Sequence, residues 1–130
     1  MLPALLRGGT LPEEYEIHGR RNAEFEGYIP QTREGATMTN IGKRLYLIAG
    51  LSLNLTNSLS VFTQNSFHWA RIEIPRTFLA RCGHSAVSTN NRQEIVVFGG
   101  VNEYIRESNT QSCLNSITIY NIRECSFKDV

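Results

Sequence analysis

The chain has 130 residues, of which 41% are hydrophobic and 19% are charged, a composition typical of a folded domain and unlike that of a disordered segment. Lys and Arg together number 13, and Asp and Glu together number 12. The chain therefore lacks the large positive excess with which proteins neutralise nucleic-acid phosphates or anionic lipid surfaces, which argues against a nucleic acid or a membrane as its partner.

Residues 1–32 show no regular pattern of core positions. The opening apolar run is broken by Pro3 and ended by Arg7, which does not fit a secretory signal. The charged residues that follow present no apolar face, while the run 23–29, followed by Pro30, has the pattern of a short outer strand. We expect this segment to form either an N-terminal arm lying on a partner or a partial strand of another sheet.

Residues 33–80 contain a series of short β-strand patterns. Leu45–Ile48 is a continuous apolar run, as expected for a strand covered on both faces, and it is too short for a buried helix. Residues 57–62 alternate between apolar and polar side chains, and so do residues 69–74, where Pro75 ends the pattern. No segment shows a long, capped helical period, so the chain is predicted to be all-β.

The same series recurs in residues 81–130, which predicts two structural repeats of about fifty residues. Four segments correspond in order, at separations that grow from 48 to 58 residues because about eight residues are inserted between the second and third segments. The corresponding pairs are 33–37 with 81–85, 43–50 with 93–100, 57–62 with 115–120, and Trp69 with Phe127.

The cysteines and the longest uncharged stretch bear on the compartment. Cys82, Cys113 and Cys125 are odd in number and form no Cys-x-x-Cys motif, which argues against a disulfide framework and favours a reducing compartment. Residues 45–70 are long enough to span a bilayer, but polar side chains are spread through them, so no membrane span is expected. We expect a cytoplasmic protein.

Each repeat resembles the kelch repeat, in which a unit has four strands, a Gly pair ends the second strand and an aromatic residue opens the fourth. The resemblance covers about residues 30–130. In the first repeat Ala36, Ala49 and Phe62 stand where the family has histidine, glycine and tyrosine, and in the second repeat Phe127 replaces tryptophan. The positions that carry the resemblance are Gly35, Gly50, Trp69, Gly83, His84, Gly99, Gly100, Tyr120 and Phe127.

The resemblance implies an all-β fold of two four-stranded kelch-type propeller blades, residues 33–80 and 81–130, preceded by the arm or partial strand of residues 1–32. Propellers close with about 4–8 blades, because each blade buries its faces only against its neighbours. The two blades are therefore expected to belong to a larger or inter-chain completed β-propeller. The remaining blades would come from the rest of a longer polypeptide, from copies of this chain around one axis, or from another chain.

The sequence contains no convincing catalytic constellation. Cys82 and His84 would share one face of a strand, but no third side chain has ligand spacing to this pair, and the kelch resemblance makes His84 a structural hydrogen-bonding residue. Gly99–Gly100 is not followed by a helix start with Lys and Ser or Thr, so it is not a phosphate-binding loop. We predict no catalytic residue, no metal and no cofactor, and hence a protein that is not an enzyme.

Binding is predicted at one rim of the propeller. In an up-and-down four-stranded sheet, loops 51–56, 75–80 and 101–112 emerge at the same end, and loops on a rigid scaffold often carry function. Tyr and Arg are enriched at binding hot spots, and Arg can pair with an acidic segment. The alternative is an ordinary solvated loop, with Arg81 held by a structural hydrogen bond. The candidate partner-binding residues are Arg76, Arg81, Glu103, Tyr104 and Arg106.

These features favour a non-catalytic protein–protein interaction scaffold that acts as a subunit of a larger assembly. Kelch proteins are common among cytoskeletal, ciliary and ubiquitin-ligase adaptor proteins, so the resemblance implies other protein chains as partners, in a hetero-assembly or in the remainder of a longer chain, and a cytoskeletal or ciliary location within the cytoplasm. Three alternatives stay open: the substrate-recognition part of a ubiquitin-ligase adaptor, a self-assembling ring of identical chains, and a fragment of a kelch-like oxidase or sugar-processing enzyme.

Overall fold

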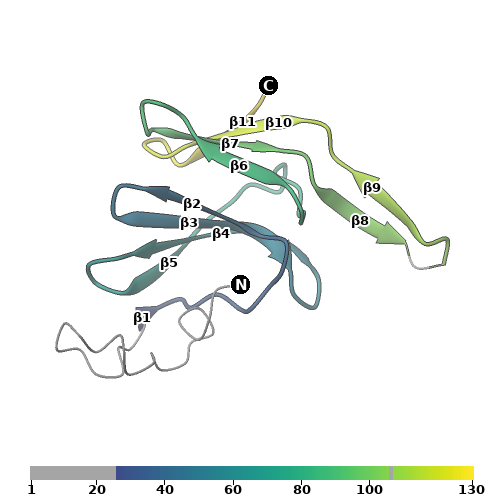
Figure 1. Ribbon diagram of the computed structural model, residues 1–130, viewed down its shortest axis with the longest axis horizontal. Helices are drawn as coiled ribbons and strands as arrows, with labels where there is room; N and C mark the ends of the chain where they lie inside the picture. The colour runs from purple at the N-terminus through teal and green to yellow at the C-terminus, as the bar shows by residue number, and fades with distance from the viewer. Residues whose placement is uncertain (1–25, 106) are drawn as a thin grey trace.

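The structure, a computed structural model, describes residues 26–105 and 107–130. Every regular element in these residues is a β-strand, so the prediction of an all-β chain is confirmed (Figure 1). No helix in the described residues is long and apolar enough to cross a membrane. Most of the predicted N-terminal arm, residues 1–25, lies outside the described residues, and so does Arg106.

The first sheet has four antiparallel strands that neighbour one another in chain order. A short fifth strand, formed by the residues that precede them, pairs in parallel with the outer edge of this sheet. The preceding segment therefore extends the first sheet. From the added edge, the strands are β1 (Glu26–Gly27), β5 (His68–Ile72), β4 (Leu55–Thr63), β3 (Arg44–Leu51) and β2 (Thr37–Ile41).

The second sheet has the same four-stranded antiparallel arrangement, and its strands lie above the first sheet in the view of Figure 1. Its edge strand β6 (Ser85–Ser88) contacts β2, an edge strand of the first sheet. From its outer edge, the strands are β11 (Ser126–Asp129), β10 (Ile117–Asn121), β7 (Glu94–Phe98) and β6 (Ser85–Ser88).

Residues 101–112, which were expected to be a loop, instead form most of a hairpin that projects from the second sheet (Figure 1). In this hairpin β8 (Val101–Ile105) pairs with β9 (Thr110–Cys113), and Asn109 takes a φ of 52° in the turn. The β-branched and aromatic residues of β8 favour a strand, which explains why the insertion is ordered into a ladder.

The two repeats agree in backbone conformation as well as in sequence. Five pairs of corresponding residues have positive φ in both repeats, although only some of them are glycine. Ala49, for example, keeps a φ of 58° where its counterpart Gly99 has 74°. The five pairs are Gly35 with Gly83, Gly42 with Arg92, Ala49 with Gly99, Gly50 with Gly100, and Phe67 with Cys125.

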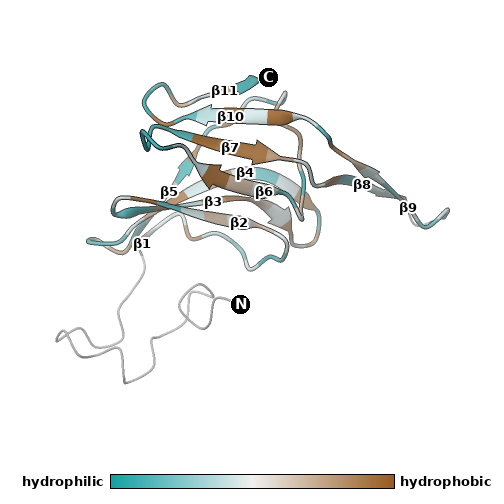
Figure 2. Ribbon diagram, turned by 45° about the horizontal axis from the view of Figure 1, so that its top comes forward, coloured by the Kyte–Doolittle hydropathy of each residue, from teal (hydrophilic) through white to brown (hydrophobic). Residues whose placement is uncertain are grey.

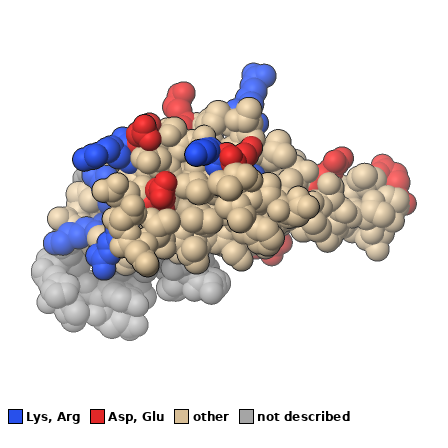
Figure 3. Space-filling model, turned by 90° about the horizontal axis from the view of Figure 1, so that it is seen from above, with Lys and Arg blue, Asp and Glu red and all other residues tan. Residues whose placement is uncertain are grey.

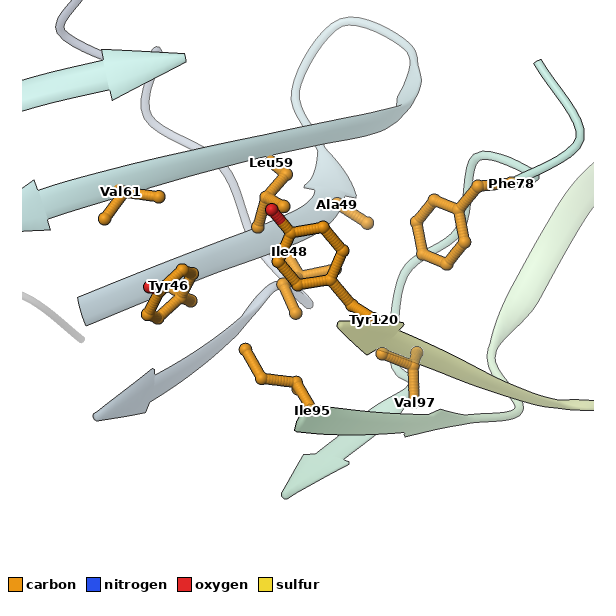
Figure 4. Packing of buried hydrophobic residues seen from close by; sticks show 9 residues of the cluster. All are labelled: Tyr46, Ile48, Ala49, Leu59, Val61, Phe78, Ile95, Val97 and Tyr120. Carbon is orange, nitrogen blue, oxygen red and sulfur yellow. The ribbon is translucent and has the colours of Figure 1, made fainter. Parts of the chain in front are cut away.

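The main core lies between the two sheets (Figure 4). Alternate residues of β3 and β4 point toward the second sheet, and alternate residues of β7 and β10 point back toward the first. Tyr46 and Tyr120 come from opposite sheets, and their ring centres are 6.5 Å apart. The buried side chains of this core are Tyr46, Ile48, Ala49, Leu59, Val61, Phe78, Ile95, Val97 and Tyr120.

A smaller apolar cluster occupies the opposite face of the first sheet. Trp69 on β5 is 1% exposed, and its ring centre lies 5.0 Å from that of Phe62, its cross-strand partner on β4. Leu47 completes the buried cluster. Because Leu47 and Ile48 are both buried on opposite faces of β3, this strand is covered on both sides, as its continuous apolar run predicts.

The sheets stack in the same sense, so that the front of one meets the back of the next. Tyr46 and Ile48 of β3 correspond in sequence to Val96 and Phe98 of β7. Tyr46 and Ile48 point toward the second sheet. Val96 and Phe98 point away from the first sheet, because β7 places Ile95 and Val97 in the core instead. The second sheet therefore has a face, equivalent to the buried face of the first, that this contact leaves unused.

Candidate interaction surface

The side of the second sheet that points away from the core carries partly exposed apolar side chains, and it is here called the outer face. The central strand β7 is mostly hydrophobic (Figure 2). The apolar side chains of the outer face form cross-strand rows in which Val87, Val96 and Ile119 neighbour one another, as do Phe98 and Ile117. Val87 is 62% exposed, Phe98 50% and Ile117 39%. These five residues are the apolar part of the outer face, and the exposed Ser85 and Lys128 lie beside Phe98 and Ile119 in the same rows.

Four of the five apolar residues of the outer face correspond by the repeat to buried core residues of the first sheet. Val96, Phe98, Ile117 and Ile119 correspond to Tyr46, Ile48, Leu59 and Val61. In the first sheet these positions are covered by the second sheet. The outer face thus has the residue types of a sheet-stacking surface without a sheet on it in the described residues.

Two corresponding glycines, near the end of β3 and just after β7, allow the chain to pass close to the residues that precede β2 and β6. A Cβ atom on Gly50, at a φ of 112°, would lie 3.0 Å from the Cβ of Ala36. A Cβ atom on Gly100, at a φ of 99°, would lie 3.0 Å from both the Cβ of His84 and the Cys82 carbonyl oxygen. Gly50 and Gly100 therefore have the same steric role in the two repeats.

His84 joins the two repeats. Its Nε2 lies 2.8 Å from the Thr37 hydroxyl, and the adjacent Gly83 N–H donates to the Gly35 carbonyl at 2.8 Å. Burial and the neighbouring positive charge of Arg81 lower the pKa of His84 to about 4, so the imidazole is neutral at neutral pH. His84 therefore lies at the junction between the sheets and holds it through a hydrogen bond.

The three predicted rim segments meet at their bases. Arg81 N–H donates to the Thr56 carbonyl at 3.2 Å, and the Asn57 side chain donates to the Phe78 carbonyl at 3.0 Å. Cys82 pairs with Val101 at the base of the projecting hairpin. The turn between β3 and β4, the link between the sheets and the hairpin are thereby held together.

Phe78 anchors this meeting point and was not foreseen in the sequence. It is 2% exposed, and its ring stacks on that of Phe127 with the centres 4.3 Å apart. A large aromatic residue in a segment expected to be a solvated loop was the available signal. Phe127, one of the repeat positions, is thus placed between β10 and the link between the sheets, with its ring 4.8 Å from that of Tyr120.

Of the predicted partner-binding residues in the described part of the chain, three are exposed and one is buried. Arg76 and Glu103 are exposed, and Tyr104 is 51% exposed with its hydroxyl donating to the Asn109 side chain at 2.6 Å. Acidic side chains lie along the projecting hairpin in the view of Figure 3. Arg106 lies outside the described residues.

Arg81 was expected to contact a partner, but its side chain is only 2% exposed. Its Nε donates to the Leu79 carbonyl at 2.9 Å, and its guanidinium carbon lies 4.3 Å from the centre of the Phe78 ring. The guanidinium is therefore used inside the molecule, at the junction of the sheets. This corrects the prediction in favour of the structural alternative.

The arrangement offers binding surfaces more readily than reactive groups. No cluster of three or more His, Cys, Asp or Glu side chains that could hold a metal occurs within residues 26–105 and 107–130. Cys113 and Cys125 are exposed and Cys82 is half-buried, all three as free thiols. Comparisons of the sequence with known protein families and with curated proteins found no match.

Proposed function

We propose that this chain is a non-catalytic protein–protein interaction scaffold, which contributes two kelch-type propeller blades to a larger assembly. The observation that supports this function best is the outer face of the second sheet. Phe98 and Ile117 are partly exposed there, at positions whose counterparts in the first sheet are wholly buried.

The stacking geometry supports a further sheet as the occupant of the outer face. A contact made by two different faces is not self-complementary, so each added unit leaves the same face open for the next until the units meet in a closed ring. The exposed apolar residues are then the half of an interface whose other half lies in the rest of a longer polypeptide or in a separate chain. Enzymatic alternatives have no comparable support.

The proposal is tested by placing a photo-activated cross-linking residue at position 98 of the natural protein in its source cells. We expect irradiation to join position 98 to one defined product, which is either a partner chain of a single mass or another part of the same polypeptide. The same residue at position 65, where Asn65 is exposed on the turn between β4 and β5, away from the outer face, is the control. Equal labelling at both positions, or none at 98, would contradict the proposal.

The denatured mass of the natural polypeptide then separates the two sources of the missing sheets. A mass of roughly 30–45 kDa or more, at about fifty residues a blade, places them in the same polypeptide. A mass near the 14.7 kDa of this sequence places them in other chains.

A further inference from the structure

A polar groove lies on the first sheet, on the face opposite the main core, and it differs in charge from its counterpart in the second sheet. The groove has a volume of about 760 Å³, within the range of about 300–1,000 Å³ usual for ligand sites. Arg33, Arg71, Ser58 and Ser60 contribute to it, together with Tyr28 and the turn between β3 and β4. None of its described lining residues is Asp or Glu. We call it the arginine groove.

Both arginines of this groove donate hydrogen bonds to neutral groups, Arg33 in a part-buried position and Arg71 at the surface. Arg33 donates to the Ala49 carbonyl at 3.1 Å and to the Ser58 hydroxyl at 2.8 Å. Arg71 donates to the Tyr28 hydroxyl at 3.0 Å, and its guanidinium carbon lies 5.2 Å from the centre of the Tyr28 ring. Positioned guanidinium groups without a carboxylate among the described lining residues are typical of a site that takes up an anion.

The second repeat contains the same set of positions with one decisive difference. Arg33, Ser58 and Ser60 correspond to Arg81, Ser116 and Thr118, so the basic and hydroxyl groups are kept. Arg71, however, corresponds to Asp129. Asp129 accepts a hydrogen bond from the Thr118 hydroxyl at 2.7 Å. The second repeat therefore supplies its own carboxylate at the place where the first repeat has a second arginine.

The pKa values of Arg33 and Arg81 reflect this difference in neighbouring charge. Burial lowers the pKa of both Arg33 and Arg81. The negative charge of Asp129 partly offsets this effect at Arg81, whereas the positive charge of Arg71 adds to it at Arg33. A carboxylate bound between Arg33 and Arg71 would supply the charge that Asp129 supplies in the second repeat.

We propose that the arginine groove binds a side-chain carboxylate of an acidic segment from a partner protein, held between Arg33 and Arg71. The class of ligand follows from the internal counterpart, in which the group that faces the arginine is an aspartate. The site is separate from the outer face of the second sheet, and it adds a second contact to the proposed interaction function.

The binding test uses the full chain and two capped peptides, Gly-Glu-Gly-Glu-Gly and its glutamine counterpart, with inorganic phosphate as a third probe. NMR signals of the arginine Nε–H groups report on the site directly. We expect the glutamate peptide to shift the Arg33 and Arg71 signals, less strongly as salt is added, and the glutamine peptide to leave them unchanged. Equal effects of both peptides, no effect of either, or binding of phosphate alone would overturn the proposal.

Two variants of Arg71 sharpen the test. Arg71→Gln should weaken glutamate-peptide binding about ten- to a hundredfold, the usual loss for a charge-assisted hydrogen bond. Arg123→Gln, which removes an exposed arginine from a turn of the second sheet, is the matched control and should bind normally. Equal weakening by both variants would overturn the site.

Arg71→Asp reproduces the charge arrangement of the second repeat within the first. It should abolish peptide binding and also melt at a higher temperature than Arg71→Gln, because Arg33 then has an internal counter-ion. Retained peptide binding, or a melting temperature no higher than that of Arg71→Gln, would overturn the argument from Asp129. Phe98→Thr should leave peptide binding intact, so failure at the groove and failure at the outer face are distinguishable.

Discussion

At the scale of single residues, the junction between the repeats depends on a few buried polar groups. His84 Nε2 is paired with Thr37, while its Nδ1 has no hydrogen-bond partner among the described residues. The neighbouring charge of Arg81 disfavours a second positive charge on the ring. Such a residue contributes to stability only while it stays neutral.

The first prediction concerns pH. In the folded chain His84 has a pKa of about 4, against an ordinary value of 6.5. Between these values the unfolded state binds more protons, so the contribution of His84 is complete above about pH 6.5 and is lost progressively as the pH falls toward 4. Melting temperatures at about pH 7, 5.5 and 4.5 should decline in the parent chain and decline less in His84→Gln. Identical slopes in the two proteins would show that another group dominates.

The second prediction separates backbone strain from steric conflict at glycines. Gly83 has a φ of 70° and open space where a Cβ would lie, whereas Gly100 has a φ of 99° and two atoms within 3.0 Å of that position. Gly83→Ala should cost about 1–2 kcal/mol, from the left-handed backbone alone. Gly100→Ala should cost clearly more, because His84 or the backbone of Cys82 must move. Denaturant unfolding of the two variants measures the difference, and equal losses would refute the close approach.

At the scale of elements, the strands of the first sheet are linked through the aromatic pair of β4 and β5. Trp69 is almost fully buried against Phe62, and it lies on β5, the strand with which β1 pairs. An indole in this position stabilises both the cross-strand contact and the apolar cluster on this face.

Trp69→Ala should therefore lower the free energy of unfolding by about 3–5 kcal/mol, the usual cost of removing a buried aromatic side chain. Phe67→Ala is the matched control, because Phe67 belongs to the same cluster but is only partly buried, and it should cost less. Equilibrium unfolding in urea gives both values. A Trp69→Ala protein as stable as the parent would mean that the cluster does not hold this sheet together.

The hairpin β8–β9 has the opposite character, since its exposed side chains contribute little to the core. If Tyr104 and Arg106 contact a partner, replacing both with Ala should abolish co-purification of that partner and change the stability by no more than about 1 kcal/mol. Quantitative co-purification from source cells checks this, with Asn65→Ala as a control on the exposed turn between β4 and β5. Undiminished recovery of the partner would move the contact away from the hairpin.

At the scale of the whole molecule, an uncovered apolar face makes the isolated chain prone to self-association. Val87→Thr together with Phe98→Thr keeps the β-branched preference for strands while making the outer face more polar. We expect this double variant to sediment as a monomer at protein concentrations where the parent associates, with Leu53→Thr behaving like the parent. Unchanged association of the double variant would show that the self-association surface lies outside the outer face.

Much of this architecture follows from local sequence patterns. The apolar run Leu45–Ile48 and its counterpart 95–98 predict central strands, because their length and composition leave few alternatives. The placement of Arg71 opposite Ser60, beside Arg33, does not follow from such patterns, because it depends on cross-strand register. The burial of Phe78 does not follow from these patterns either, because it requires the link between the sheets to pass over β11, where Phe78 stacks on Phe127. Alternation of side chains therefore predicts elements well, while contacts between distant segments need the assembled fold.

The front-to-back stacking also has a consequence for how the protein is made. The four antiparallel strands of each sheet come from one stretch of the chain, with the hairpin β8–β9 inserted in the second, so a sheet can form as soon as its own residues have left the ribosome. Its apolar face, however, waits for the next sheet: Tyr46 and Ile48 stay uncovered until Ile95 and Val97 have been synthesised. Phe98 and Ile117 of the second sheet then remain exposed until a further sheet covers them. Nascent chains of this protein are thus expected to need chaperone protection in steps, one for each sheet that awaits its neighbour.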